Sequence, residues 1–410
     1  MSPILEIIPA DHDEATEFLV ELARALAANG STAERIEGAL STAAERLGIH
    51  AEFFATPTSV FASVGKGTRN STRLVRVESA DINLDRLTRL DAILQAVSAR
   101  TISIADARAG IEETLASPSP WPIWVFVLAH TMTGACATLF FGGRWHEVAV
   151  GAAAGLTVGL LSLLTDRVRR LVRVFEFLSG AVVSSVALVA ANRLPGLNTD
   201  LVIVAGLIAL IPGLSLTIAV SEVSTRHLLS GAARLIGAAA SLASIAFGVA
   251  AGSSLVRALL PIEAPVTIEP LPAPAQWAAL ALAPTALAVL FKANPRDIPA
   301  IIAIAAVGFL SARELGGSLG PELAAGASAI IVGLLANARA TWANRPVAVG
   351  IIPGLILLVP GSIGFRSLTA FIEQETVRGL ETAVLAVVIA LAIATGLLLA
   401  NVLLPVKRNL

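Results

Sequence analysis

The chain has 410 residues, of which 55% are hydrophobic and only 14% are charged, and its mean hydropathy is +0.79. These values exclude an ordinary soluble protein and indicate a membrane protein. Residues 1–120 carry 11 Lys/Arg and 17 Asp/Glu, whereas residues 121–410 carry 18 and 13. The first part is acidic and has no basic patch interleaved with aromatic residues, so we expect no nucleic-acid partner.

The pattern of apolar residues over 1–117 predicts a small α+β domain. The expected elements are helices over 13–30 and 31–48, a strand–turn–strand over 51–65, a strand over 72–79, and helices over 83–100 and 103–116. Ser31 is followed three residues later by Glu34, a capping-box pattern for the second helix. No basic segment opens the chain, so we expect this domain to stay in the cytosol.

The same domain contains no Gly-rich phosphate loop, no HExxH motif and no recognisable nucleophile–base arrangement. Its hydroxyl cluster, Thr56, Thr58 and Ser59 around Pro57, is typical of a turn. We therefore expect no enzyme, no cofactor and no metal. A membrane-anchored hydrolase remains an alternative, and it would need a base within hydrogen-bond reach of this cluster. A regulatory membrane protein without a transport cycle is a second alternative.

Ten apolar runs in the second part are long enough to cross a hydrocarbon core of about 30 Å. They lie at roughly 121–141, 147–165, 174–191, 200–221, 228–252, 276–292, 297–312, 320–338, 346–365 and 379–404. The seventh is the weakest, and a re-entrant segment there is an alternative. With both termini in the cytosol, twelve Lys/Arg flank the cytosolic ends and six the outer ends, as the positive-inside rule requires.

Two Pro-Gly pairs occur in one apolar stretch, GIIPGLILLVPGSIGF (350–365), and the first has an echo. Residues 211–216 read IPGLSL and residues 352–357 read IPGLIL. Aligning on this echo pairs the fourth span with the ninth and the fifth with the tenth. The predicted fold is therefore an α-helical polytopic membrane protein built as a 5+5 inverted repeat, with repeats at 118–260 and 276–410 joined by a Pro-rich outer connector at 261–275.

A Pro-Gly break leaves backbone groups unpaired, which lipid does not tolerate unless the break is buried or lines a cavity. Two inverted copies would bring Pro212-Gly213 and Pro353-Gly354 together near the midplane. Carbonyls and half-helix N-termini freed there could bind a polar solute. Close packing of small residues is the alternative explanation.

At these motifs the sequence resembles the threonine/serine exporter family, over roughly 15–405. The matching segments are LARALAANGSTAERIE, FFATPTSVFAS, TRLVRV, NLDRLTRLDAILQAV, LIPGLSLTIAVSEVSTRHLLSGAARL and RPVAVGIIPGLILLVPGSIGFRSL. The resemblance implies a plasma-membrane exporter of small hydroxy amino acids, namely threonine and serine. It also implies antiport driven by the proton-motive force and a cytosolic N-terminal domain.

Residue roles in the solute site are inferred from chemistry. The candidate substrate-binding residues are Pro212, Gly213, Ser215, Thr217, Pro353, Gly354, Pro360, Gly361 and Ser362. The helix N-termini at the breaks would hold the carboxylate, and the hydroxyl side chains would meet the solute hydroxyl. Back-bonding of these hydroxyls to their own helix carbonyls is the alternative.

Two carboxylates are candidates for proton coupling, because ionisable groups at membrane depth are functional candidates by default. Glu222, close to Arg226 and Arg234, is the first, and Glu176 is the second. Solvated charges at the cytosolic interface are the alternative. The expected partners are a small amino-acid solute, protons and the lipid bilayer, and a homo-oligomer is left open. Finally, GAAAGLTVG (151–159) predicts a tight helix-packing face.

Overall fold

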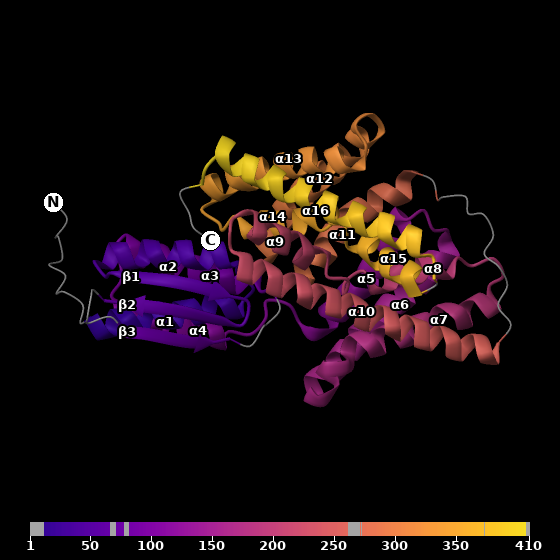
Figure 1. The fold of residues 1–410 in the computed structure, drawn as a ribbon, viewed down its shortest axis with the longest axis horizontal. Coiled ribbons are helices and arrows are strands. Elements are labelled where there is room, and N and C mark those ends of the chain that lie inside the picture. The colour runs from indigo at the N-terminus through magenta and orange to yellow at the C-terminus, as the bar shows by residue number, and fades with distance from the viewer. Residues whose placement is uncertain are drawn as a thin grey trace.

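The computed structural model describes residues 12–65, 71–77, 82–260, 271, 273–372 and 374–406. Figure 1 shows an α+β part at one end, formed by the N-terminal elements, and a larger helical body beside it. The predicted connector at 261–275 lies mostly outside the described residues. Lys407 and Arg408, two of the twelve predicted cytosolic charges, lie outside them too.

The N-terminal domain contains the elements that the sequence predicts. They are α1 (His12–Ala28), α2 (Ala33–Leu47), β1 (Ala51–Thr56), β2 (Ser59–Val64), β3 (Ser71–Arg76), α3 (Leu84–Ser98) and α4 (Ile104–Ala116). The strands form one antiparallel sheet in the order β1-β2-β3, and Thr56 pairs with Ser59 across the predicted Pro57 turn. Helix α1 packs on β2 and β3, and α2 packs on β1. The domain limits themselves stay predictions.

The predicted capping box at the start of α2 is wrong. The N-cap residue is Thr32, and its side chain makes no capping hydrogen bond. The backbone N–H of Ala33 instead donates to Glu222 Oε1 at 3.1 Å. A carboxylate from the helical body therefore takes the place of a local cap, and no local sequence pattern could predict it.

The helical body contains twelve α-helices in the described part of the chain. They are α5 (Ile123–Phe140), α6 (Trp145–Arg167), α7 (Phe175–Arg193), α8 (Thr199–Leu207), α9 (Gly213–Ser224), α10 (Leu228–Leu259), α11 (Ala273–Leu290), α12 (Ile298–Leu319), α13 (Pro321–Ala343), α14 (Ala348–Leu355), α15 (Gly361–Ile372) and α16 (Thr376–Leu403). Two short 3₁₀ helices, η2 (Arg169–Val174) and η3 (Pro295–Asp297), precede α7 and α12.

Seven helices among the described residues are long and apolar enough to cross a membrane. Helix α12 is one of them, because the helix that begins in the weak seventh run continues to Leu319. The other three predicted runs correspond to the shorter helix α11 and to two broken segments, α8–α9 and α14–α15. Apolar side chains face outward from the long helices, for example Ile236 and Phe247 of α10 and Val387 of α16. The chain is a polytopic helical membrane protein.

The same order of helices occurs twice, as α5–α10 and α11–α16: three helices, then a broken pair, then a long helix. The packing recurs as well, since α7 contacts α10 as α13 contacts α16. The two long helices that end these series, α10 and α16, run in opposite directions (Figure 1). His227, at the start of α10, contacts Glu37 of the N-terminal domain, whereas Asn401, near the end of α16, lines a cavity with Arg35 of that domain.

Small residues let neighbouring helices approach closely, as predicted for 151–159. A methyl group added to Gly151 would lie 2.1 Å from Thr138 Oγ1 of α5. One added to Gly155 would lie 2.3 Å from the carbonyl oxygen of His130. The predicted packing face of α6 is therefore confirmed.

The two broken segments cross at Gly213 and Gly361. Each break ends in a Pro-Gly pair that opens the next helix, Pro212-Gly213 before α9 and Pro360-Gly361 at the start of α15. A methyl group added to Gly213 would lie 2.8 Å from Gly361 Cα, so the two backbones touch.

The expected meeting of Pro212-Gly213 with Pro353-Gly354 is wrong. Pro353 lies inside α14, and Gly354 packs on Ile304 and Val332. The repeated letters IPGL therefore do not mark equivalent places. The second Pro-Gly pair, Pro360-Gly361, occupies the position that corresponds to Pro212-Gly213.

Candidate functional site

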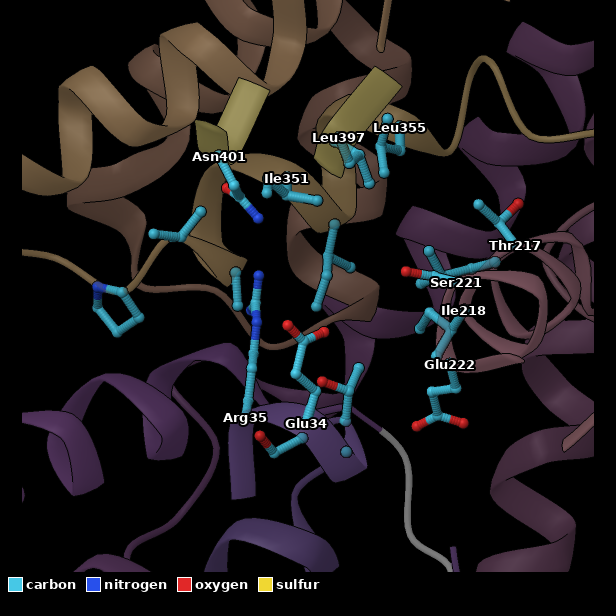
Figure 2. A pocket seen from close by; sticks show the side chains of 18 of the residues that line it. Glu34, Arg35, Thr217, Ile218, Ser221, Glu222, Ile351, Leu355, Leu397 and Asn401 are labelled. Carbon is cyan, nitrogen blue, oxygen red and sulfur yellow. The ribbon is translucent and has the colours of Figure 1, made fainter. Parts of the chain in front are cut away.

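A cavity of about 460 Å³ lies where the start of α2 meets α9, α14 and the end of α16 (Figure 2). Its polar lining includes Glu34 and Arg35 from α2, Ser221 from α9 and Asn401 from α16. Its apolar walls come mainly from α9, α14 and α16. The site therefore needs the N-terminal domain and both halves of the helical body.

Helical periodicity explains the two inner walls. From α9 the residues Leu214, Thr217, Ile218 and Ser221 line the cavity, and from α14 the residues Ala348, Ile351, Ile352 and Leu355 do so. Each set follows the spacing i, i+3, i+4, i+7, which places its members on one helix face. Because α9 begins at the crossing, this wall leads from the crossing toward the N-terminal domain.

Two opposite charges at the start of α2 face the cavity (Figure 2). Arg35 is half-buried, and Glu34 is exposed. Neither side chain makes a hydrogen bond or an ion pair with any residue that the structure describes. Burial lowers the pKa of the Arg35 guanidinium below its usual value, while the neighbouring Glu34 charge acts in the opposite direction.

Glu222 is 2% exposed at the edge of the cavity and accepts three hydrogen bonds. The donors are the Ala33 N–H at 3.1 Å, Ser230 Oγ at 2.9 Å and Arg234 Nε at 3.0 Å. Three donors around one carboxylate fit its ionised form. Of the two arginines close to Glu222 in the sequence, Arg226 is exposed and Arg234 forms the ion pair. Glu222 is therefore no solvated surface charge, and it joins α9, α10 and α2.

Further contacts attach the N-terminal domain to both halves of the helical body. His227 Nε2 lies 3.3 Å from Glu37 Oε2. On the other half, the backbone N–H groups of Leu84 and Asp85 donate to the carbonyl oxygens of Phe291 and Lys292 at 3.0 and 3.1 Å. One apolar cluster also continues from the core of the N-terminal domain into α9, α12 and α14. These contacts hold the start of α2 against the cavity.

The structure brings only part of the predicted site together. Thr217 and Glu222 line the cavity. The Thr217 hydroxyl donates to the Gly213 carbonyl at 3.1 Å, which is the back-bonding alternative. Ser215 and Ser362 lie in the first turns of α9 and α15, at the crossing rather than in the cavity, and their hydroxyls bond to no described residue.

Other predicted residues lie elsewhere. Glu176 is half-buried in the first turn of α7 and does not line the cavity. Pro353 and Gly354 are buried in the interior of α14. The sequence reasoning missed Arg35, Ser221 and Asn401. Only long-range contacts unite these three, so spacing along the chain could not group them.

The hydroxyl cluster of the N-terminal domain closes its turn. Thr56 Oγ1 donates to the Ser59 carbonyl at 3.0 Å and accepts from the Ser59 N–H at 3.1 Å. This is the expected turn chemistry. No His, Asp or Glu side chain bonds to Thr56 or Ser59 within the described residues.

The fold and the cavity define a multi-pass helical membrane protein whose N-terminal α+β domain shares a polar cavity with two broken helices. Two family descriptions match almost all of this chain: "Putative threonine/serine exporter" over residues 17–256 and "Threonine/Serine exporter, ThrE" over residues 276–403. The protein belongs to the threonine/serine exporter family, which is a family of transporters rather than of enzymes.

Several curated proteins are similar to the chain. "Pheromone-regulated membrane protein 10" of Saccharomyces cerevisiae (strain YJM789) is 25% identical over 374 residues, which cover 87% of this chain and 48% of that protein. "Probable threonine/serine exporter" of Mycobacterium tuberculosis is 25% identical over 342 residues, which cover 81% of this chain and 64% of that protein. "Pheromone-regulated membrane protein 10" of Candida albicans (strain WO-1) is 26% identical over 386 residues, which cover 91% of this chain and 34% of that protein. The chain thus spans about half or less of these two fungal proteins, and no solved structure matches it.

Proposed function

We propose that this protein is a secondary transporter that exports threonine, serine or similar small hydroxy amino acids across the plasma membrane. The observation that carries the proposal is the cavity, which extends from charged residues of the N-terminal domain along α9 as far as Leu214, the residue that follows Gly213 at the crossing of the broken helices. Membership of an exporter family supplies the solute class. The N-terminal domain and the C-terminus lie in the cytosol in this proposal, so the cavity is the loading side.

The transport path would continue through the crossing. The recurring helix order and the opposite directions of α10 and α16 support a 5+5 inverted repeat with ten spans, counting each broken pair as one. Helices α9 and α15 both begin at the crossing, at Gly213 and Gly361. Their N-terminal N–H groups favour an anionic group. The hydroxyls of Ser215 and Ser362, which bond to no described residue, suit a solute hydroxyl.

Glu222 is the proposed coupling carboxylate, with Glu176 as second candidate. Protonation of Glu222 would remove the charge that Arg234 pairs with and weaken the acceptor of the Ala33 N–H. Proton uptake would then loosen the contact between α9 and α2. Proton binding at Glu222 would in this way change the wall of the solute cavity, as antiport driven by the proton-motive force requires.

The test is export from cells fed a threonine-containing dipeptide, with internal and external threonine measured over time. We expect intact protein to lower internal threonine and the Pro212→Ala/Pro360→Ala variant not to do so at equal membrane abundance. Pro321→Ala, at the exposed first position of α13, is the matched control. A protonophore should abolish export. If intact protein changes neither threonine nor serine, the proposed solute class is wrong.

A further inference from the structure

We propose that Arg35 and Glu34 form the loading site for the transported amino acid, with Arg35 binding its carboxylate and Glu34 its ammonium group. The inference rests on the proposed function and assigns a direct role in solute binding to the N-terminal domain. It locates the first binding event at the cavity, before the solute reaches the crossing of α9 and α15.

Arg35 differs from the other buried or half-buried arginines near the membrane domain. Arg234 pairs with Glu222 and Arg339 with Asp297, whereas Arg35 has no acceptor among the described residues. A guanidinium withdrawn from water without an acceptor is unfavourable, and burial lowers its pKa accordingly. A carboxylate in the cavity would supply two acceptor oxygens in the geometry that arginine binds best.

The neighbouring groups suit the rest of a small amino acid. Glu34 offers an acceptor for an ammonium group beside Arg35. Asn337 donates to Asn401 Oδ1 at 3.0 Å, so the amide nitrogen of Asn401 is left for the cavity, and Figure 2 shows it pointing toward Arg35. The Ser221 hydroxyl has no partner among the described residues and suits a solute hydroxyl.

Size and polarity are consistent with one small solute. The cavity volume of about 460 Å³ falls within the range of roughly 300–1,000 Å³ typical of small-molecule sites. The walls opposite α2 are apolar, with Ile218 of α9 and Ile351 of α14 among them. A solute with a short side chain could thus place its charged groups on α2 and its methyl group against α9 and α14.

The test is direct binding of radiolabelled L-threonine to the purified full-length protein in lipid nanodiscs, with threoninol, which lacks the carboxylate, as a competitor. Arg35→Gln should raise the Kd for threonine about 10- to 100-fold, the loss expected for a charge-assisted hydrogen bond. It should also abolish the preference for threonine over threoninol. Glu34→Gln should weaken the binding of threonine but not that of N-acetylthreonine, whose nitrogen carries no charge.

Arg46→Gln is the matched control, because Arg46 is exposed at the other end of α2, away from the cavity. We expect it to bind threonine like the intact protein. Size-exclusion profiles and thermal melting establish that each variant is folded, and Arg35→Lys should recover part of the affinity.

The outcomes separate the inference from the proposed function. Suppose that cells with the intact protein export threonine, and that Arg35→Gln binds threonine with the same Kd and exports it with the same KM. Then the inference is overturned and the exporter function stands. If intact protein exports and binds neither threonine nor serine, both the function and the inference fall.

Discussion

Glu222→Gln should weaken the contact between the start of α2 and the membrane domain. The substitution keeps an oxygen that can accept the Ala33 N–H but removes the charge that pairs with Arg234 at 3.0 Å. Removing one partner of a fully buried pair costs about 3–5 kcal/mol. Arg234 is 20% exposed and regains some hydration, so we expect about 2–3 kcal/mol at this contact.

That loss corresponds to a roughly 30- to 150-fold rise in the population in which this contact is open. The measurement is amide hydrogen exchange of the peptide covering residues 31–40 in nanodiscs. Exchange at the first turn of α2 should accelerate in Glu222→Gln, while exchange in α4, remote from the contact, stays unchanged. Glu381→Gln, an exposed carboxylate on α16, is the control.

A double-mutant cycle with Arg234→Gln identifies the cause. Because the two side chains act as a pair, the double variant should be little worse than either single variant. If Glu222→Gln leaves exchange at the first turn of α2 unchanged, Glu222 does not hold the N-terminal domain in place.

Two further predictions concern packing and charge. Gly213→Ala should lower the melting temperature and export, because its methyl group would lie 2.8 Å from Gly361 Cα; we expect a loss of about 1–3 kcal/mol from overpacking. Gly237→Ala in α10, where a methyl group meets nothing within 4 Å, should be neutral or stabilise by about 0.5–1 kcal/mol, and a loss there equal to that at Gly213 would contradict the argument. Asp297→Asn should cost about 3 kcal/mol in thermal melting, since it leaves Arg339 and Arg345 facing each other without the buried carboxylate; an unchanged melt would mean that this pair adds nothing to stability.

Features governed by neighbouring residues could be predicted from the sequence. The helices and strands of the N-terminal domain follow from apolar periodicity, and Pro57 marks the turn that pairs Thr56 with Ser59. The long apolar runs are helices, and the small residues at 151–159 pack where expected. Each of these depends on one element or on two elements adjacent in the chain.

Features set by contacts between distant segments could not be predicted. The sequence predicts a capping box at the start of α2, yet Glu222 from α9 provides the acceptor. The IPGL echo indicated two broken segments but the wrong pair of breaks, because Pro353 lies inside the short buried helix α14 and the second break falls at Pro360-Gly361 instead. Arg35 belongs to no sequence motif, and its proposed role rests on the lack of an acceptor among the described residues once the N-terminal domain is docked.

The first turn of α2 links the two proposed events. The Ala33 N–H is held by Glu222, and the next two residues are Glu34 and Arg35. A proton on Glu222 and a solute on Arg35 would thus act on the same helix end, and thermodynamic linkage requires the effects to be reciprocal.

Saturating threonine should therefore slow amide exchange in residues 31–40 of the intact protein and have no such effect on Arg35→Gln. In Glu222→Gln the affinity for threonine should fall, although Glu222 itself is occupied by three protein donors. The measurements are the Kd for threonine and the amide exchange rate of residues 31–40, each in the intact protein, in Arg35→Gln and in Glu222→Gln. If threonine binds all three equally and protects none of them, the solute and the Glu222 contact are independent, and proton coupling must be sought elsewhere, with Glu176 the next carboxylate to replace.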